Sequence, residues 1–330
     1  MKAIFYSEYG PPDVLHFVDV EKPVPKDDEV LIRIHAASVN ALDWRLLRGK
    51  PALARVMTGG LFKPRHNIPG ADAAGCVEAV GRNVTEFQPG AEVFGAIGTG
   101  GFAEYACATE DRLVVKPAGI SYEQAAAVPV AALTALQALR HAGRIQSGQN
   151  VLIDGASGGV GTFAVQIAKS FGAEVTAVCS TKAVATARSI GADHVIDYSQ
   201  RDFTSSGELY DLIVAANAHH SLFDYKHALK PGGTYVMAGG GGGEILQAMF
   251  LGPLVSRIGN KKLVILMAKR NKKDLVFLKE LLATKKITSV IDRRYALRDA
   301  ADAIRYIEQG HAKGKIVITV IPDRAAIAVP

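Results

Sequence analysis

Cysteine is scarce in this sequence: among 330 residues only Cys76, Cys107 and Cys179 are present. They lie too far apart in the sequence to supply a C-x-x-C metal clip or a framework of disulfides. A composition without such a framework is typical of proteins from a reducing compartment. We therefore expect a cytoplasmic protein that folds without disulfides.

Long apolar runs are absent as well. The sequence has no stretch of eighteen uninterrupted apolar residues, which is about what a membrane-spanning helix needs. The first residues, MKAIFYSEYG, lack the charged lead and the long apolar core of a secretory signal. The sequence thus predicts no membrane span and no export.

The net charge of +6 has no concentrated source. The densest basic groups, Lys261–Lys262, Lys269–Lys273 and Lys285–Lys286, contain no interleaved aromatic residues, so a nucleic-acid partner is not indicated. A solvated surface or an anionic cofactor accounts for such a charge. With 48% hydrophobic residues and no low-complexity tract, the chain is expected to form two folded domains.

What the sequence does contain is a glycine-rich turn within Asn150–Lys169, NVLIDGASGGVGTFAVQIAK. An apolar strand pattern precedes the turn and a helical pattern follows it. Glycines let the backbone approach a phosphate, and the amides and dipole of a helix start favour an anion. The motif differs from G-x-G-x-x-G in its first position, Ala156. We predict a dinucleotide pyrophosphate site at Gly155, Ala156, Ser157, Gly158, Gly159 and Val160, with a plain strand-turn-helix as the alternative.

Strands and helices alternate from Val151 to about Met267. Apolar, β-branched runs predict strands at residues 151–153, 174–179, 194–197, 212–215, 234–237 and 263–267. Helical patterns between them cover residues 160–171, 182–190 and 222–229. This β-α-β order predicts an α/β fold with a doubly wound parallel sheet of the Rossmann type.

Residues 1–117 have a different pattern, with short β-rich runs separated by proline and glycine. It predicts an antiparallel barrel or sandwich, with strands at residues 30–36, 75–80, 102–106 and 113–115. Ser121 is expected to cap a helix, and Pro129 to break the alanine-rich helix of residues 125–140. Helices at 274–283 and 299–308 and a strand at 315–321 are expected to return to this unit. The predicted domains are residues 1–121 with 268–330, and residues 122–267.

The second strand of the Rossmann pattern ends without an acidic residue. Sites for NAD usually carry a carboxylate there, which binds the ribose 2′-hydroxyl. This sequence has Ser180, Thr181 and Lys182 instead, which offer hydrogen-bond donors and a positive charge to a 2′-phosphate. We therefore predict NADPH as the cofactor; the alternative for Lys182 is an ordinary exposed lysine in a first helical turn.

Two further segments follow strands of the predicted sheet. Tyr198 comes directly after the strand of residues 194–197, where its ring could flank an adenine and its hydroxyl reach a phosphate. Gly239 and Gly240 begin the glycine run 239–243, which follows the strand of residues 234–237. Nucleotide sites form at the carboxyl edge of such sheets, so we assign Tyr198, Gly239 and Gly240 to the cofactor site. The alternatives are a surface tyrosine and a flexible surface loop.

Motifs spread over nearly the whole chain carry a family resemblance. They stand in order at residues 38–44 (SVNALDW), 68–75 (IPGADAAG), 101–105 (GFAEY), 126–135 (AAVPVAALTA), 155–161 (GASGGVG), 191–198 (GADHVIDY), 229–233 (LKPGG) and 314–317 (GKIV). The chain resembles the medium-chain dehydrogenase/reductase superfamily, and within it the zinc-independent quinone oxidoreductase branch. The resemblance implies a GroES-like barrel domain, an NADPH-binding Rossmann domain, a cleft between them and a homodimer.

The residue types at the positions of the zinc ligands argue against a zinc site. Zinc-dependent relatives carry G-H-E where this chain has Gly70-Ala71-Asp72, and a methyl group cannot bind a metal. No cysteine lies near Asn40–Asp43, where those relatives place their first ligand, and no group of four cysteines exists. We therefore expect no metal. Without a Lewis acid, alcohol oxidation is disfavoured, whereas reduction of an electron-poor quinone or α,β-unsaturated carbonyl remains feasible.

The resemblance also implies catalytic positions. Asn40 and Asp43 would line the cleft near the nicotinamide, and the Thr134 hydroxyl would contact its carboxamide or ribose. The alternatives are a turn cap for Asn40, a helix cap or an Arg48 partner for Asp43, and a helix residue bonding backward for Thr134. Relatives often have Thr-Tyr after the aspartate where this chain has Trp44-Arg45, so we expect the proton to come from water through the cofactor ribose. An apolar pocket, or equally a core or subunit contact, is suggested for Trp44, Phe62, Met249, Phe250 and Leu254.

The leading prediction is an NADPH-dependent, zinc-free oxidoreductase that transfers hydride to a small-molecule quinone or other activated carbonyl acceptor. An alkenal or enone reductase in the strict sense is a close second. From another class, the chain is compatible with an NADPH-binding structural or interaction protein with little turnover.

Overall fold

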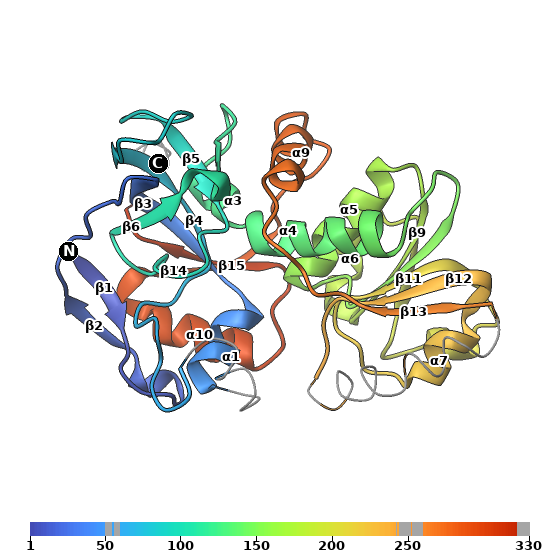
Figure 1. The fold of residues 1–330 in the computed structure, drawn as a ribbon. Coiled ribbons are helices and arrows are strands. Elements are labelled where there is room, and N and C mark those ends of the chain that lie inside the picture. The colour runs from blue at the N-terminus through green and yellow to red at the C-terminus, as the bar shows by residue number, and fades with distance from the viewer. Residues whose placement is uncertain (50–54, 56–59, 242, 244–251, 253–259, 322–330) are drawn as a thin grey trace, which may run out of the picture. The chain divides into compact units, whose positions relative to one another are not determined.

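A computed structural model describes residues 1–49, 55, 60–241, 243, 252 and 260–321 (Figure 1). The chain divides into two units. Unit 1 comprises residues 1–130, 270–283 and 291–330, and unit 2 comprises residues 131–269 and 284–290. The domain limits predicted from the sequence differ at three places. They put residues 122–130 in the Rossmann domain and residues 268–269 and 284–290 in the barrel domain. None of the described helices is long and apolar enough to cross a membrane.

Unit 2 is built on a six-stranded parallel sheet, which confirms the predicted Rossmann fold. Its strand order is β10-β9-β8-β11-β12-β13. The strands are β8 (Asn150–Asp154), β9 (Glu174–Cys179), β10 (His194–Asp197), β11 (Tyr210–Ala215), β12 (Leu229–Met237) and β13 (Lys262–Ile265). The first strand, β8, has β9 on one side and β11 on the other, so the winding reverses between β8 and β11. Such a reversal is where ligands bind in open parallel sheets.

Helices cover both faces of this sheet. They are α4 (Pro129–Leu136), α5 (Gly159–Ser170), α6 (Val184–Ser189) and α7 (Leu222–His227), with α5 and α7 on opposite faces (Figure 1). Right-handed crossovers that run in opposite directions from β8 place their helices on opposite faces. The central strands are therefore buried on both sides, and Val151, Leu152 and Ile153 have no exposed surface.

Unit 1 contains the β-rich fold expected from the first part of the chain. Its large sheet has the order β14-β15-β3-β4-β5-β7, with β6 also paired to β3, and β1 and β2 form a separate pair. The strands are β1 (Lys2–Phe5), β2 (His16–Asp19), β3 (Glu29–Val39), β4 (Asp72–Val80), β5 (Glu92–Gly95), β6 (Tyr105–Thr109), β7 (Leu113–Val115), β14 (Ile291–Ala296) and β15 (Lys315–Thr319). The helices are α1 (Ala41–Arg48), α3 (Tyr122–Ala126), α9 (Lys272–Ala283) and α10 (Ala300–Glu308).

Strands β6 and β14 are among those that differ from the sequence prediction. The strand expected at Phe102–Ala106 begins instead at Tyr105, because Phe102 bonds to other segments: its N–H donates to the Pro69 carbonyl and its carbonyl accepts from Ile4. Strand β14 was not predicted, since its sequence, IDRRYA, is largely polar. It pairs in parallel with β15, at the edge of the sheet where polar side chains face solvent.

The predicted break at Pro129 is confirmed. Ser121 caps α3 by accepting a hydrogen bond from the Gln124 amide, and the Gln124 side chain bonds back to the Ser121 amide. Helix α3 ends at Ala126 and α4 starts at Pro129, where a proline needs no hydrogen-bond partner. After α4 the chain continues through a π-helical turn, Gln137–Ala142.

Helix α5 approaches the end of β8 so closely that only glycine fits at Gly161. A Cβ atom there would lie 2.1 Å from the Gly155 carbonyl oxygen and 2.7 Å from the Ala156 Cα atom. At Gly158 the corresponding Cβ atom would meet nothing closer than the Gly155 oxygen at 3.6 Å, an ordinary contact.

These two glycines make a matched pair for a stability test. We expect Gly161→Ala to lower the free energy of unfolding by about 2 kcal/mol or more, since the methyl group must push α5 away from β8. Gly158→Ala should cost only about 0.5 kcal/mol, because its methyl group meets no atom closer than the Gly155 oxygen at 3.6 Å. Urea unfolding of both variants measures the difference, and equal losses would contradict this packing argument.

Candidate functional site

The glycine turn leaves the start of α5 without a capping side chain. Gly158 is the N-cap residue, in an extended conformation, and its own N–H donates to the Gly155 carbonyl at 3.1 Å. The first amides of the helix, from Gly159 and Val160 onward, have no acceptor within the helix. Together with the helix dipole they form a site suited to an anion.

The neighbouring residues fix this turn in place. Gly155 has a positive φ of 76°, and a side chain there would meet Asn217 at 2.9 Å. The Ala156 side chain is fully buried, and its N–H donates to the Val178 carbonyl of β9 at 3.0 Å. Ser157 is half-buried beside them. The turn therefore presents backbone amides, and no large side chain blocks an approaching phosphate.

Ser180, Thr181 and Lys182 follow the carboxyl end of β9. Ser180 begins a single 3-10 turn, Thr181–Ala183, and the side chains of Thr181 and Lys182 are exposed. The Thr181 hydroxyl lies 2.9 Å from the Ser199 hydroxyl. Within the described residues, no ion pair engages the Lys182 ammonium, so it is available to an anionic group.

Tyr198 follows the neighbouring strand, β10, and its side chain is 61% exposed. Its N–H donates to the Cys179 carbonyl at the end of β9, which brings it beside the Ser180 turn. Sequence reasoning missed the carboxylate next to it, Asp197. Hydrogen bonds from Thr181 and Ser199 hold the pKa of that carboxyl below its ordinary value. The pattern Asp197-Tyr198-Ser199, an aspartate two residues before a serine, is the signal that predicts such a turn.

Gly239 and Gly240 follow β12, and they run beside the segment that follows β11. The Ala218 N–H donates to the Gly239 carbonyl at 3.0 Å, and a Cβ atom on Gly239 would lie 2.3 Å from the Ala216 oxygen. All the predicted cofactor residues thus follow the carboxyl ends of strands in one sheet. Met249, Phe250 and Leu254 lie outside the described residues.

The predicted catalytic residues do not form one cluster within a unit. Asn40 and Asp43 lie in unit 1, at the start of α1, whereas Thr134 lies in α4 of unit 2 and is largely buried. Trp44 is half-buried against the core of unit 1, with the Arg45 guanidinium 5.4 Å from its ring. Phe62 is 87% exposed.

Asn40 and Asp43 belong to a buried polar network. The Asn40 N–H donates to the Asp43 carboxylate at 2.7 Å, which caps α1. The Asn40 side-chain amide donates to Asp72 at 2.9 Å, and its oxygen accepts from the Lys315 ammonium at 2.6 Å. Asp72 also accepts from the Ser38 hydroxyl and from the Val130 N–H. Arg48 pairs with Glu308, so its suggested pairing with Asp43 is not what the structure shows.

Burial dominates the electrostatics of this network. It raises the pKa of Asp43 to about 7, and the nearby Asp72 charge adds to the rise. Burial also raises the pKa of Asp72, although Lys315, Asn40 and Ser38 oppose the shift. It lowers the pKa of Lys315, against the attraction of the two carboxylates. The network therefore holds two acids and one base whose charges depend on one another.

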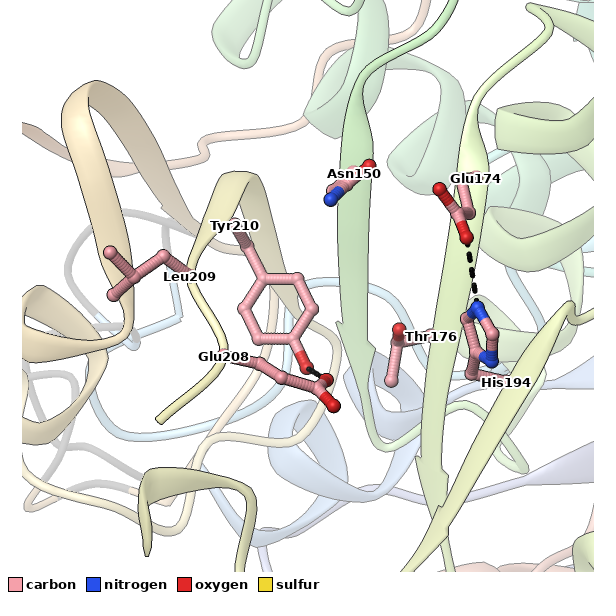
Figure 2. Close-up of a pocket in the computed structure, with 7 residues that line it drawn as sticks. All are labelled: Asn150, Glu174, Thr176, His194, Glu208, Leu209 and Tyr210. Atoms are coloured by element: carbon pink, nitrogen blue, oxygen red, sulfur yellow. Dashed lines mark hydrogen bonds and ion pairs between the residues drawn. The ribbon is translucent and has the colours of Figure 1, made fainter. Parts of the chain in front are cut away.

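A pocket of about 270 Å³ lies at the other edge of the unit 2 sheet (Figure 2). Its lining residues are Asn150, Glu174, Thr176, His194, Glu208, Leu209 and Tyr210, which lie at or near the amino ends of β8, β9, β10 and β11. Glu174 and His194 face each other at 2.9 Å, and the Tyr210 hydroxyl donates to Glu208. This pocket is separate from the glycine turn, because the two lie at opposite ends of the same strands.

Over the part of the chain that the structure describes, no three or more His, Cys, Asp and Glu side chains are grouped closely enough to hold a metal ion. Ala71 is buried and presents a methyl group. The next residue, Asp72, has both carboxylate oxygens engaged by hydrogen bonds from Ser38, Asn40 and Val130.

The raised pKa of Asp43 predicts a pH-dependent stability. Because folding raises it from an ordinary value of about 3.9 to about 7, the folded chain favours the protonated carboxyl. That contribution is complete below about pH 4 and is lost as the pH rises through about 7. Between about pH 5 and pH 8, we expect the wild type to lose on the order of 1–4 kcal/mol relative to Asp43→Asn.

Urea unfolding at both pH values measures this loss. Asp28→Asn, which changes an exposed aspartate of the same unit, is the control and should follow the wild type. A constant difference between Asp43→Asn and the wild type across the range would contradict the assignment.

Comparison with known proteins places the chain in a family. Residues 26–118 match the family described as "Alcohol dehydrogenase GroES-like domain", and residues 190–318 match the one described as "Zinc-binding dehydrogenase". The chain is 36% identical to the quinone-oxidoreductase homolog, chloroplastic, of Spinacia oleracea, over 96% of its own length and 98% of the relative's. It is 31% identical to the NADPH-dependent alkenal/one oxidoreductase, chloroplastic, of Arabidopsis thaliana, over 98% and 80%.

A solved structure agrees with this placement. The quinone oxidoreductase from Coxiella burnetii matches with a TM-score of 0.84 at 30% sequence identity, covering 97% of this chain and 99% of that one. The chain therefore belongs to the medium-chain dehydrogenase/reductase superfamily, in its quinone oxidoreductase branch.

Proposed function

We propose that this protein is an NADPH-dependent, zinc-independent reductase of quinones or other α,β-unsaturated carbonyl compounds. The observation that carries the proposal is that the uncapped start of α5 and an available cation, Lys182, both lie at the carboxyl edge of one sheet. The names of the two relatives support the acceptor class, and the name of the second supports the cofactor.

The residues present suit NADPH. The free backbone amides of Gly159 and Val160 would bind the pyrophosphate, in a turn where no Cβ atom of Gly158 blocks the approach. Ser180, Thr181 and Lys182 would bind the 2′-phosphate, and the exposed ring of Tyr198 would flank the adenine. Gly239 and Gly240 give the cofactor a side-chain-free border. When bound, the cofactor supplies a hydride from its nicotinamide ring.

We propose that acceptor reduction needs no zinc, because the side chains at positions 71 and 72 are unsuited to bind it. Ala71 offers no lone pair where zinc-dependent relatives have a histidine. The oxygens of Asp72 are already engaged, and the Lys315 ammonium lies 3.8 Å from one of them. An acceptor that is already electron-poor needs alignment and a polar group at its oxygen more than it needs a Lewis acid. Quinones and enones meet that condition.

The three predicted catalytic residues take different roles in this proposal. The Thr134 hydroxyl remains the candidate for contact with the nicotinamide carboxamide or ribose. Asn40 and Asp43 act by positioning, because their side chains are engaged in the buried network. Water supplies the proton that accompanies the hydride.

The deciding experiment combines a binding titration with an acceptor panel. We expect NADPH to bind in fluorescence titration and to be oxidised when a quinone or an enal is added, but not with simple ketones. Binding without oxidation by any acceptor would favour the alternative, an NADPH-binding structural or interaction protein. A protein that binds neither NADPH nor NADH would remove the proposal.

Lys182→Glu tests the preference for NADPH. A carboxylate repels the 2′-phosphate that the ammonium attracts, so we expect NADPH to bind at least tenfold more weakly and NADH to change little. Lys262→Glu, an equal charge change at the exposed amino end of β13, is the matched control and should leave both affinities unchanged. If the ratio of NADPH to NADH affinity stays the same in Lys182→Glu, the 2′-phosphate is bound elsewhere.

Gly158→Ala tests the pyrophosphate site. Its methyl group is tolerated by the fold but occupies the space that a phosphate would enter, so NADPH and NADH should both bind at least tenfold more weakly. Gly243→Ala, at a glycine where an added Cβ atom meets nothing within 4 Å, is the control. Unchanged affinity in Gly158→Ala, with normal folding, would place the pyrophosphate away from this turn.

A further inference from the structure

Lys315 carries a buried ammonium inside a cage of oxygen atoms. Its side chain is only 3% exposed. The Nζ atom lies 2.6 Å from the Asn40 side-chain oxygen, 3.3 Å from the Val39 carbonyl oxygen and 3.8 Å from an Asp72 carboxylate oxygen. A buried lysine is costly unless such partners compensate it, so its presence calls for a reason.

We propose that Lys315 is a positioning residue, which fixes the side-chain amide of Asn40 and thereby the start of α1 on the acceptor side of the site. This inference rests on the proposed function, and it assigns a role to the lysine of the GKIV motif at residues 314–317. Lys315 contacts neither acceptor nor cofactor, and it acts through Asn40.

The amide of Asn40 can adopt only one orientation in this cage. Its nitrogen donates to the Asp72 carboxylate at 2.9 Å, and its oxygen accepts from the Lys315 ammonium at 2.6 Å. Turning the amide over would set the NH₂ group against an ammonium and the oxygen against a carboxylate. Both hydrogen bonds would be lost and both replacements would be repulsive. A neutral side chain at position 315 would remove half of this discrimination.

Lys315 also compensates the charge of the network. The described groups that face its ammonium are the carboxylates of Asp43 and Asp72, the Asn40 amide and the Val39 carbonyl. These come from β3, α1 and β4, whereas Lys315 belongs to β15. One ammonium therefore joins segments about 275 residues apart in sequence, as the Lys315–Asn40 contact shows. Removing it leaves buried acids without a cation.

The test is Lys315→Ala with chemical rescue. We expect kcat/KM for a quinone to fall at least tenfold while the NADPH Kd stays within twofold, because the cofactor contacts lie in unit 2. Propylammonium chloride should enter the space left by the side chain and restore both the melting temperature and kcat/KM. Sodium chloride at equal ionic strength should restore neither.

The matched control is Lys116→Ala. Lys116 is another buried lysine of unit 1, with its ammonium 2.7 Å from the Ile120 carbonyl oxygen and 3.3 Å from Glu92, and no contact with Asn40 is found for it. Its replacement should lower the melting temperature and leave kcat/KM unchanged below that temperature. A general effect of losing a buried cation would instead lower kcat/KM equally in both variants, and that result would overturn the proposal.

A double mutant separates positioning through Asn40 from an independent effect. Asn40→Ala/Lys315→Ala should be no less active than Asn40→Ala alone, since Lys315 has nothing left to position. Losses that multiply would overturn the inference. If Lys315→Ala does not fold, Asp72→Asn/Lys315→Met removes one charge of each sign, and it should regain folding while kcat/KM stays low.

Failure of the proposed function has a different signature. If none of the acceptors tested supported NADPH oxidation by the wild type, there would be no such reaction, and Lys315 could not position any group for it. In that case, the melting temperatures still test whether the cage binds an ammonium group. Propylammonium should raise the melting temperature of Lys315→Ala and not that of Lys116→Ala.

Discussion

The close contact between α5 and the end of β8 is the constraint on which the candidate cofactor site depends. A helix can present its first amides to a ligand only if the preceding turn is short and carries no side chain in the way. Gly161 allows the helix to lie against the Gly155 carbonyl, and Gly155 turns the chain through a positive φ beside Asn217. As a consequence, a single added methyl group at Gly161 would disrupt the packing. The same glycines therefore determine both the packing of this turn and the shape of the candidate site.

The buried network of unit 1 depends on the balance between two carboxylates and one ammonium. A buried acid is costly without a compensating cation, and in this chain an ammonium lies 3.8 Å from Asp72. Lys315 is held by an amide oxygen and a backbone carbonyl as well, which is the kind of oxygen surrounding that a cation requires. The acceptors in the proposed function are ones that need no Lewis acid to polarise their oxygen.

Much of the fold could be predicted from the sequence, because the relevant signals are local. The glycine turn, the apolar parallel strands and the capping of α3 by Ser121 each depend on neighbouring residues. Strand β14 could not be predicted, since its polar sequence becomes a strand only by pairing with β15. The position of β6 was wrong for the same reason: hydrogen bonds from Phe102 to distant segments decide where that strand begins. Pairing across long distances leaves little trace in a local pattern.

The candidate site shows the same division between local and distant information. The placement of the predicted cofactor residues at one edge of the sheet could be read from the sequence, because each follows a strand of that sheet and parallel strands bring their carboxyl ends together. The partners of Asn40 were not, since Asp72 and Lys315 lie 32 and 275 residues away in sequence. From the sequence, an asparagine and an aspartate three residues apart are compatible with a pair of site residues or with a helix cap. The structure shows the cap, and it shows that the distant Lys315 ammonium engages the Asn40 side chain. Both ends of the Asn40 amide are engaged, which leaves the side chain few hydrogen-bonding groups for a substrate, and in the proposed reaction it contributes by fixing the start of α1.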